Sequence, residues 1–169
     1  FPPRLYVTNP TLDNFTGLIR IQGQAAVPME RYIFNSIFVA VFATAGYILV
    51  ASMAAYPLAK CKFPLKAVLM QLIVFAILFR TEVTAVPQYI LMVKTKLIDT
   101  YAALILPAMG TSFGVFLMIQ FTEGIPEEIL ESARIDGAKE VKLFFTIVLP
   151  MVKPAWLTLG IFTFSSVWN

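Results

Sequence analysis

The chain alternates between long apolar stretches and short polar ones. Apolar residues dominate residues 32–56, 67–93, 101–121 and 155–169. A helix needs roughly 20 mostly apolar residues to cross the hydrocarbon core of a bilayer. The first three stretches reach that length, and the fourth is apolar up to Trp168, one residue before the end of the sequence. The pattern predicts an all-α fold, a polytopic transmembrane helical bundle of about four spans, in a chain that we interpret as a fragment.

Two charged residues interrupt the second apolar stretch. Arg80 and Glu82 follow a clean apolar run, and Pro87 comes soon after them. A charged residue deep in the bilayer costs roughly 2.5–3.5 kcal/mol on insertion scales, so this pair needs an explanation. Either the two side chains pair or reach toward the membrane surface, or they face an aqueous path through the protein. The residues alone leave both interpretations open.

The first and third stretches carry small residues that permit close helix packing. Ala43 and Gly46 lie in the first stretch, and Gly110 and Gly114 form a GxxxG pair in the third. Small side chains let two helix backbones approach each other closely in a membrane. We therefore expect these helices to pack within the chain, with a kink in the third at Pro107.

Lysines in the short loops predict the orientation in the membrane. The polar segment 57–66 carries Lys60, Lys62 and Lys66, and short loops rich in lysine face the cytoplasm. The polar segment 1–31 would then lie outside. A second basic set supports the same orientation, because it places residues 122–154 in the cytoplasm: Arg134, Lys139, Lys142 and Lys153.

Composition narrows the class of protein and excludes several kinds of chemistry. The chain is 59% hydrophobic and only 14% charged, against about 25% charged in soluble domains. It has no His and one Cys, which excludes Ser–His and Cys–His catalysis, histidine metal sites and an internal disulfide. It has no GxxxxGK[ST] phosphate-binding loop and no basic run with interleaved aromatic residues. We expect no enzyme, no metal, no cofactor and no nucleic-acid partner.

The segment 123–154 differs from the rest because charged and apolar residues alternate in it at helical spacing. Ile129 and Ala133 are four residues apart, as are Leu130 and Arg134. Residues at this spacing lie on one side of a helix, so the helix has an apolar side and a charged side. The pattern predicts a short amphipathic helix between two membrane spans.

Prolines and a glycine set the limits of this amphipathic segment. Pro126 suits the first position of a helix, where its missing N–H costs nothing. Gly137 can adopt the left-handed conformation that closes a helix. A second short helix is expected over residues 138–146, limited by Pro150 and Pro154. Helix, glycine turn and helix together form what we call the elbow, residues 122–154.

The elbow closely resembles the EAA motif of ABC importer permeases. The family pattern is Glu-Ala-Ala, three residues, Gly, nine residues, Ile, one residue and Leu-Pro. Here the matching residues are Glu131-Ser132-Ala133, Gly137, Ile147 and Leu149-Pro150, with Asp136 and Ala138 completing an Asp-Gly-Ala core. Every interval fits. The one departure is Ser132, where the pattern has alanine, and both residues are small.

More of the chain resembles the sugar-importer branch of this family, which is similar to maltose-type permeases. The marks are Thr11-Leu12-Asp13-Asn14-Phe15, Asn35-Ser36, Ala54-Ala55-Tyr56, Glu82-Val83-Thr84 with Pro87, Asp99-Thr100, Ile125-Pro126-Glu127, and Phe164 with Trp168-Asn169. Arg80 departs from it, where a proline or a neutral residue is expected. By the resemblance, one helix before Phe1, the end of the last span and a final helix lie outside this sequence.

The resemblance implies a function and partners. It implies a permease subunit of an ABC importer in the cytoplasmic membrane, which moves a carbohydrate by alternating access. Its partners would be a second permease, ATP-binding subunits and an extracytoplasmic solute-binding protein. The residues that would couple it to the ATPase are Glu131, Ser132, Ala133, Asp136, Gly137, Ala138, Ile147, Leu149 and Pro150. Polar residues of the spans are candidates for the translocation path: Asn35, Gln71, Glu82, Thr84, Gln88 and Ser112.

Three alternatives remain open at this point. The elbow can be an amphipathic helix that only rests on anionic lipid. The solute can be different, such as a glycerol phosphate or a polyamine. The protein can also be a secondary transporter or a membrane enzyme that uses Arg80 and Glu82, although the residues show no catalytic constellation.

Overall fold

Regular structure in this computed structural model is helical throughout the described residues, which are 12, 16–17, 28–79 and 81–168. The all-α prediction is confirmed. The chain divides by its internal contacts into two units, residues 1–37 and 38–169. The helices are α2 (Met29–Lys60), α3 (Lys66–Leu78), α4 (Thr81–Lys94), α5 (Tyr101–Ala108), α6 (Ser112–Glu123), α7 (Glu127–Ile135), α8 (Glu140–Leu143), the π-helix η1 (Phe144–Val148), α9 (Leu149–Met151) and α10 (Lys153–Trp168).

The described helices provide up to 4 candidate membrane spans. One helix, α2, is long and apolar enough to cross a membrane by itself. Three further pairs of helices are long and apolar enough only when the two members are counted together, and each pair is bent at a short break. These pairs are α3 with α4, α5 with α6, and the 140–151 stretch with α10. The first three predicted apolar stretches correspond to α2 and the first two bent pairs, and the fourth corresponds to α10, whose partner stretch 140–151 lies in the elbow.

The first predicted span extends further than the sequence indicates. Helix α2 continues past Tyr56 to Lys60, with Pro57 inside it. A proline lacks the N–H that would bond one turn back, and the helix nevertheless continues past it, with the Cys61 N–H donating to the Pro57 carbonyl at 2.9 Å. The predicted loop 57–66 is consequently reduced to residues 61–65, and Lys60 is a helix residue rather than a loop residue.

The second predicted span is divided between Leu78 and Thr81, where there is no proline. The helix ends at Leu78, and the axis of residues 83–94 makes an angle of 105° with that of α3. Pro87, the expected interruption, lies inside α4. Arg80 lies outside the described residues, as does the side chain of Glu82, so the two interpretations of this pair stay predictions.

The third span is also two helices, bent by 44°. Helix α5 contains Pro107, and the break follows at Met109–Thr111 before α6 begins at Ser112. A proline removes one hydrogen bond of the helix ladder, and kinks in helices occur at such points. The break is bounded by a bond from the Gly110 N–H to the Pro107 carbonyl, 3.1 Å.

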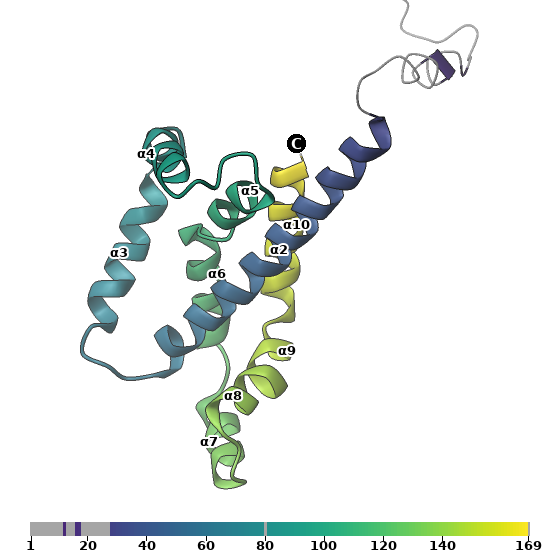
Figure 1. Cartoon of the computed structure of the whole chain (residues 1–169). Coiled ribbons are helices and arrows are strands. Elements are labelled where there is room, and N and C mark those ends of the chain that lie inside the picture. The colour runs from purple at the N-terminus through teal and green to yellow at the C-terminus, as the bar shows by residue number, and fades with distance from the viewer. Residues whose placement is uncertain (1–11, 13–15, 18–27, 80, 169) are drawn as a thin grey trace, which may run out of the picture. The chain divides into compact units, whose positions relative to one another are not determined.

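The buried core lies where α2, α6, the elbow and α10 meet. In Figure 1 α6 leads directly into α7, and α8 and α9 return the chain to α10. Helices α2, α6, α7, α8 and α10 each contribute a buried apolar side chain to one cluster, for example Ala51, Met118, Leu130, Leu143 and Leu159. The core thus joins the elbow to three of the span helices.

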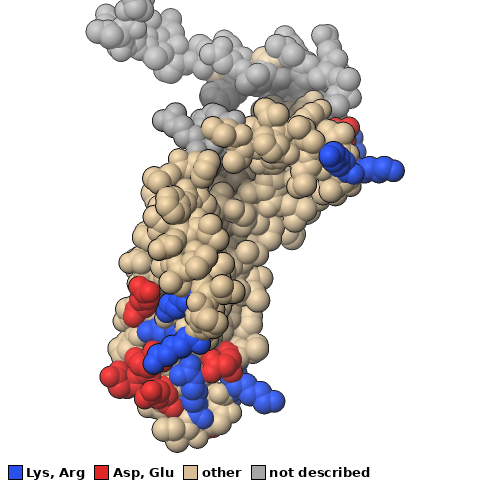
Figure 2. Space-filling model, turned by 90° about the vertical axis from the view of Figure 1, so that its left-hand side faces the viewer, with Lys and Arg blue, Asp and Glu red and all other residues tan. Residues whose placement is uncertain are grey.

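Apolar side chains also cover much of the outer surface. Helix α3 has no buried residue, and its exposed residues include Leu72 and Phe75. Figure 2 shows that most charged side chains gather at one end of the molecule, that a smaller group lies near the other end, and that a broad surface of other residues lies between them. A large exposed apolar surface marks contact with lipid or with another protein.

Candidate functional site

Gly137 closes α7 in the conformation that the sequence predicts. Its φ angle is +81°, in the left-handed region where residues with a Cβ are strained. The N–H of Ala138 donates to the Ala133 carbonyl at 3.0 Å, and the N–H of Gly137 donates to the Arg134 carbonyl at 3.0 Å. These two bonds form a Schellman motif. The helix therefore ends sharply, and the tip of the elbow has a fixed backbone.

The two faces of α7 differ from the predicted ones. Leu130 is fully buried in the core, whereas Ile129 is 40% exposed and Ile135 is 86% exposed. The helical spacing placed Leu130 on the same side as Arg134, the predicted charged side. In the structure Leu130 instead packs into the hydrophobic core. Ala133 packs against the same core. An exposed isoleucine beside the glycine turn is available to a partner protein.

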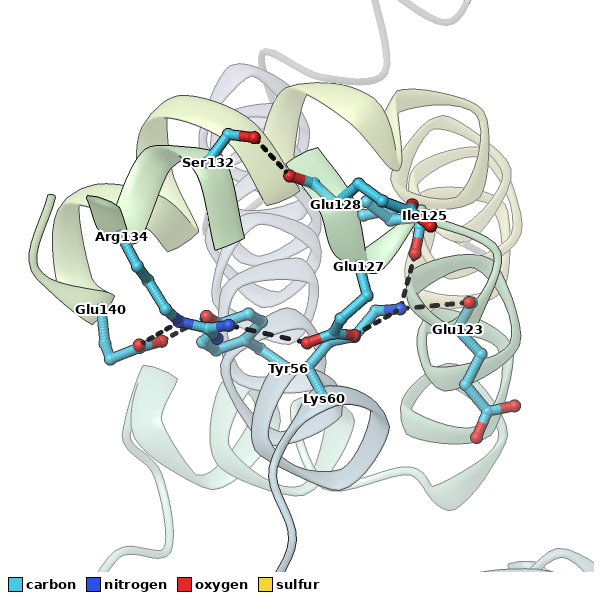
Figure 3. Close-up of polar contacts among 9 residues, drawn as sticks. All are labelled: Tyr56, Lys60, Glu123, Ile125, Glu127, Glu128, Ser132, Arg134 and Glu140. Atoms are coloured by element: carbon cyan, nitrogen blue, oxygen red, sulfur yellow. Dashed lines mark hydrogen bonds and ion pairs between the residues drawn. The ribbon is translucent and has the colours of Figure 1, made fainter. Parts of the chain in front are cut away.

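Arg134 holds the two arms of the elbow together (Figure 3). Its Nε donates to Oε1 of Glu140 at 2.9 Å, and its Nη1 lies 3.6 Å from Oε1 of Glu127. The Tyr56 hydroxyl donates to Oε2 of Glu140. The hydrogen bonds from Arg134 and then Tyr56 hold the pKa of Glu140 below its ordinary value, because both stabilise the carboxylate. The same carboxylate raises the pKa of Arg134.

Lys60 anchors the connection between α6 and α7. Its Nζ donates to the carbonyl of Ile125 at 2.6 Å and to that of Glu123 at 3.2 Å. It also lies 3.6 Å from Oε2 of Glu127, and its side chain is only 8% exposed. A cation at the end of a helix satisfies carbonyls that have no partner within the helix. Figure 3 shows Lys60 reaching into this turn, while the Glu123 carboxylate points away from it.

Other motif residues face outward. Glu131 and Asp136 are exposed, and within the described part of the chain neither side chain has a hydrogen bond or an ion pair. Ser132 donates from Oγ to the Glu128 carbonyl at 2.7 Å. This bond within the helix satisfies the hydroxyl that distinguishes Ser132 from the alanine of the motif. The elbow thus separates residues that hold it together from residues that remain available.

The end of the motif forms a wide helical turn. Pro150 supplies no N–H for the preceding turn, and the residues before it form the π-helix η1. A π-turn accommodates such an irregularity within a helix. The Trp156 Nε1 donates to the Leu149 carbonyl at 3.2 Å, and Ile147 packs against the core. At Val152 the chain bends by 74° into α10, before Pro154.

Three of the predicted path residues line one cavity of about 760 Å³. Thr84 and Gln88 on α4 face Ser112 at the start of α6, together with Thr95 and Thr111. Gln71 is exposed on α3 and does not line this cavity. Asn35 belongs to the separate unit 1–37, and the side chain of Glu82 lies outside the described residues. The described residues contain no group of His, Cys, Asp and Glu placed to hold a metal ion.

Residues 32–169 match the family described as binding-protein-dependent transport system inner membrane component. The chain belongs to this family. The motif spacing and the glycine turn agree with that membership, and the protein is therefore a membrane protein of the transport-permease class.

The chain is also similar to two named proteins. The chain is 35% identical over 147 residues to the sn-glycerol-3-phosphate transport system permease protein UgpE of Yersinia enterocolitica, covering 87% of this chain and 52% of the relative. It is 34% identical over 161 residues to the "Probable ABC transporter permease protein PH1036" of Pyrococcus horikoshii, covering 94% and 57%. The chain spans about half the length of these relatives.

A solved structure shares the family fold. It is a bacterial ABC transporter involved in the import of the acidic polysaccharide alginate, with a TM-score of 0.73 and 27% identity. The match covers 80% of this chain and 48% of that one. Neither the family nor this likeness assigns roles to single residues.

Sequence reasoning missed the residues of α2 that hold the elbow. Tyr56 and Glu140 are 84 positions apart, and Lys60 is 65 positions from Ile125. Helical periodicity relates residues within a few turns and gives no signal at such separations. A lysine and a tyrosine at the end of a long apolar helix were the available clue, and the sequence analysis assigned Lys60 to a loop.

Proposed function

We propose that the chain is part of a permease subunit of an ABC importer, and that its elbow docks into a partner ATP-binding subunit. The observation that carries this proposal is the hydrogen-bonded glycine turn at Gly137, beside which the side chains of Glu131, Ile135 and Asp136 are exposed. The tip is joined through Leu130 to the core shared by α2, α6 and α10. Movement of the tip is therefore passed to the span helices.

The motif residues divide into two roles in this proposal. Glu131, Ser132, Asp136 and Gly137 face the ATPase, because they are exposed. A second set maintains the shape of the elbow, because its members pack against the core or form the wide turn: Ala133, Ala138, Ile147, Leu149 and Pro150. The remaining partners would be a second permease and an extracytoplasmic solute-binding protein, since the family depends on a binding protein.

We also propose the orientation that the lysines predict. Residues 57–66 and 122–154 lie on the cytoplasmic side and residues 1–31 outside. Charged residues concentrate over the elbow (Figure 2), which suits a segment in water rather than in lipid. The apolar helices between these segments would cross the membrane several times and form a transmembrane bundle.

The expected partner capture tests this proposal directly. The full-length protein, purified from its own membranes, should bring down an ATP-binding subunit. Glu131→Gln should lower that yield about three- to tenfold, because a charged contact is worth about 1.5–3 kcal/mol and only part of it is lost. Quantitative mass spectrometry of the captured complex measures the yield.

Glu123→Gln is the matched control, because Glu123 is also exposed and its carboxylate points away from the elbow contacts (Figure 3). It should leave the yield unchanged. Equal yields of ATPase for wild type and both variants would refute a docking role for Glu131. Absence of any ATPase with the wild type would refute the importer function.

The cavity supports a carbohydrate as the solute. Its described lining combines the hydroxyls of Thr84, Thr111 and Ser112 with the amide of Gln88, and contains no Lys or Arg. Neutral hydroxyl and amide groups suit the hydroxyls of a sugar, and the rings of Phe79 and Phe113 line the same cavity. A glycerol phosphate, which the name of one relative suggests, is the second candidate, and a phosphate favours a cationic partner.

Uptake by cells that carry the full-length importer should distinguish these solutes. Unlabelled neutral oligosaccharides should compete with uptake of the labelled solute, and glycerol 3-phosphate should not. Gln88→Ala should raise the KM about three- to tenfold, because one or two hydrogen bonds are lost. Gln120→Ala, on an exposed position of α6, is the control. Competition by glycerol 3-phosphate alone would assign the solute to the second candidate.

A further inference from the structure

Tyr47 lies against the break between α5 and α6. Its side chain belongs to α2 and is 3% exposed. Its hydroxyl oxygen accepts a hydrogen bond from the Gly114 N–H at 2.6 Å and donates to the Thr111 carbonyl at 3.3 Å. One hydroxyl therefore satisfies a donor and an acceptor on opposite sides of Ser112, the first residue of α6.

These two bonds supply a cap that α6 does not form by itself. Thr111 occupies the N-cap position with extended backbone, and its side chain makes no capping bond. The first N–H groups of a helix have no partner within the helix, and an unsatisfied group in a membrane interior is costly. A capping residue usually bonds the N–H two or three positions on. Tyr47 makes the bond to that third position, Gly114, from a neighbouring helix.

Two glycines make room for this arrangement. A Cβ on Gly114 would lie 3.0 Å from Cε1 of Tyr47 and closer still to its hydroxyl. A Cβ on Gly46, the neighbour of Tyr47, would lie 2.6 Å from Cε of Met109 on the other side of the break. Adjacent residues of α2 thus contact both ends of the break at close range.

The break and the elbow are held by the same helix. Thr111 and Ser112, which Tyr47 fixes, line the cavity. Tyr56 and Lys60, further along α2, bind the elbow at Glu140 and at the Ile125 carbonyl. From Tyr47 to Tyr56 the helix rises about 13.5 Å, at 1.5 Å per residue. Helix α2 therefore connects the two places where the chain is bent.

We propose that Tyr47 is a positioning residue for transport. Its hydroxyl caps α6 across the helix interface and so keeps the Thr111–Ser112 wall of the cavity in a fixed relation to the elbow end of α2. This inference rests on the proposed function, because it takes the cavity as the solute path. The capping role itself does not depend on the identity of the solute.

Thiol labelling tests the capping role without any solute. In full-length protein with Cys61→Ala and Ser112→Cys, a water-soluble thiol reagent reports the exposure of the cavity wall. Tyr47→Phe removes only the hydroxyl and should raise the labelling rate about three- to tenfold or more, because both hydrogen bonds of that hydroxyl are lost. Tyr32→Phe, at a 60% exposed position, should leave the rate unchanged. An unchanged rate with Tyr47→Phe would overturn the proposal.

Measurements of solute uptake then distinguish a positioning role of Tyr47 in transport from a role in protein stability alone. Tyr47→Phe should raise the KM for the solute while leaving capture of the ATPase at its wild-type level. Lower protein yield with unchanged KM and labelling would show a structural role only, and would overturn the proposal. Gly114→Ala, which displaces the ring, should act in the same direction and more strongly. Gly160→Ala is its control, because a Cβ there lies 3.6 Å from the nearest atom, an ordinary contact.

If no ATPase is captured by the wild type, the importer function fails, yet the labelling rates still decide whether Tyr47 caps the break. If the ATPase is captured and the rates do not differ, the importer function stands and the role of Tyr47 fails. The two failures are therefore distinguishable.

Discussion

Gly137→Val should abolish solute uptake while leaving the protein inserted in the membrane. The φ angle of +81° at Gly137 places a β-branched residue in a conformation that costs roughly 1–3 kcal/mol. No atom lies within 4 Å of an added Cβ, so the cost arises from the backbone and not from a clash within the chain. The Schellman bonds would open, and the tip would lose its shape. Uptake and ATPase capture measure the loss.

Two further substitutions separate backbone strain from contact with the ATPase. Gly137→Asn should retain most of the uptake, because Asn enters the left-handed region several times more often than other residues. If both Asn and Val abolish uptake equally, the glycine is needed for close approach of the partner and the strain explanation is wrong. Gly124→Ala is the matched control, because Gly124 has a φ of −69° and a Cβ there would lie 3.5 Å from the nearest atom.

Leu130→Ala should release the elbow from the core and reduce both stability and uptake. The side chain is 0% exposed and belongs to the cluster that joins α2, α6 and α10. Removing a buried leucine to Cβ costs about 2–5 kcal/mol, including the cavity left behind. Thermal unfolding of the full-length protein in detergent should show a lower midpoint temperature.

Ile135→Ala tests the opposite face of the same helix. Ile135 is 86% exposed, so its loss should leave thermal stability unchanged. ATPase capture should nevertheless fall, because an exposed apolar side chain is a candidate anchor for a partner groove. A lower midpoint with Ile135→Ala, or an unchanged one with Leu130→Ala, would contradict the assignment of the two faces.

The elements that sequence predicts well are those with local causes. The glycine turn at Gly137 follows from one residue and the helices on both sides of it, and the structure shows the expected left-handed backbone. The apolar stretches follow from the length that a bilayer requires, and each of them contains helix, although α2 extends beyond the first stretch at both ends. The cavity brings together Thr84, Gln88 and Ser112, which were singled out only as polar residues within spans.

The features that sequence did not predict depend on contacts across the fold. The core contact of Leu130 rather than Ile129 is decided by which side of α7 faces α2 and α6, and both residues suit an amphipathic pattern. The break at Met109–Thr111 lies beyond Pro107, where Tyr47 satisfies the exposed backbone groups. Partners separated by 64 and 67 positions leave no periodic signal.

The bonds from Lys60 and Tyr56 also bear on the order in which the protein is made. Their partners lie 63, 65 and 84 positions later in the chain. At about 5–20 residues per second, the ribosome needs roughly 4–17 s to reach Glu140 after Tyr56. The end of α2 lacks its carbonyl partners until Ile125 has been added, and it lacks its carboxylate partner until Glu140 has been added. The elbow is therefore the segment whose synthesis completes this end of the bundle.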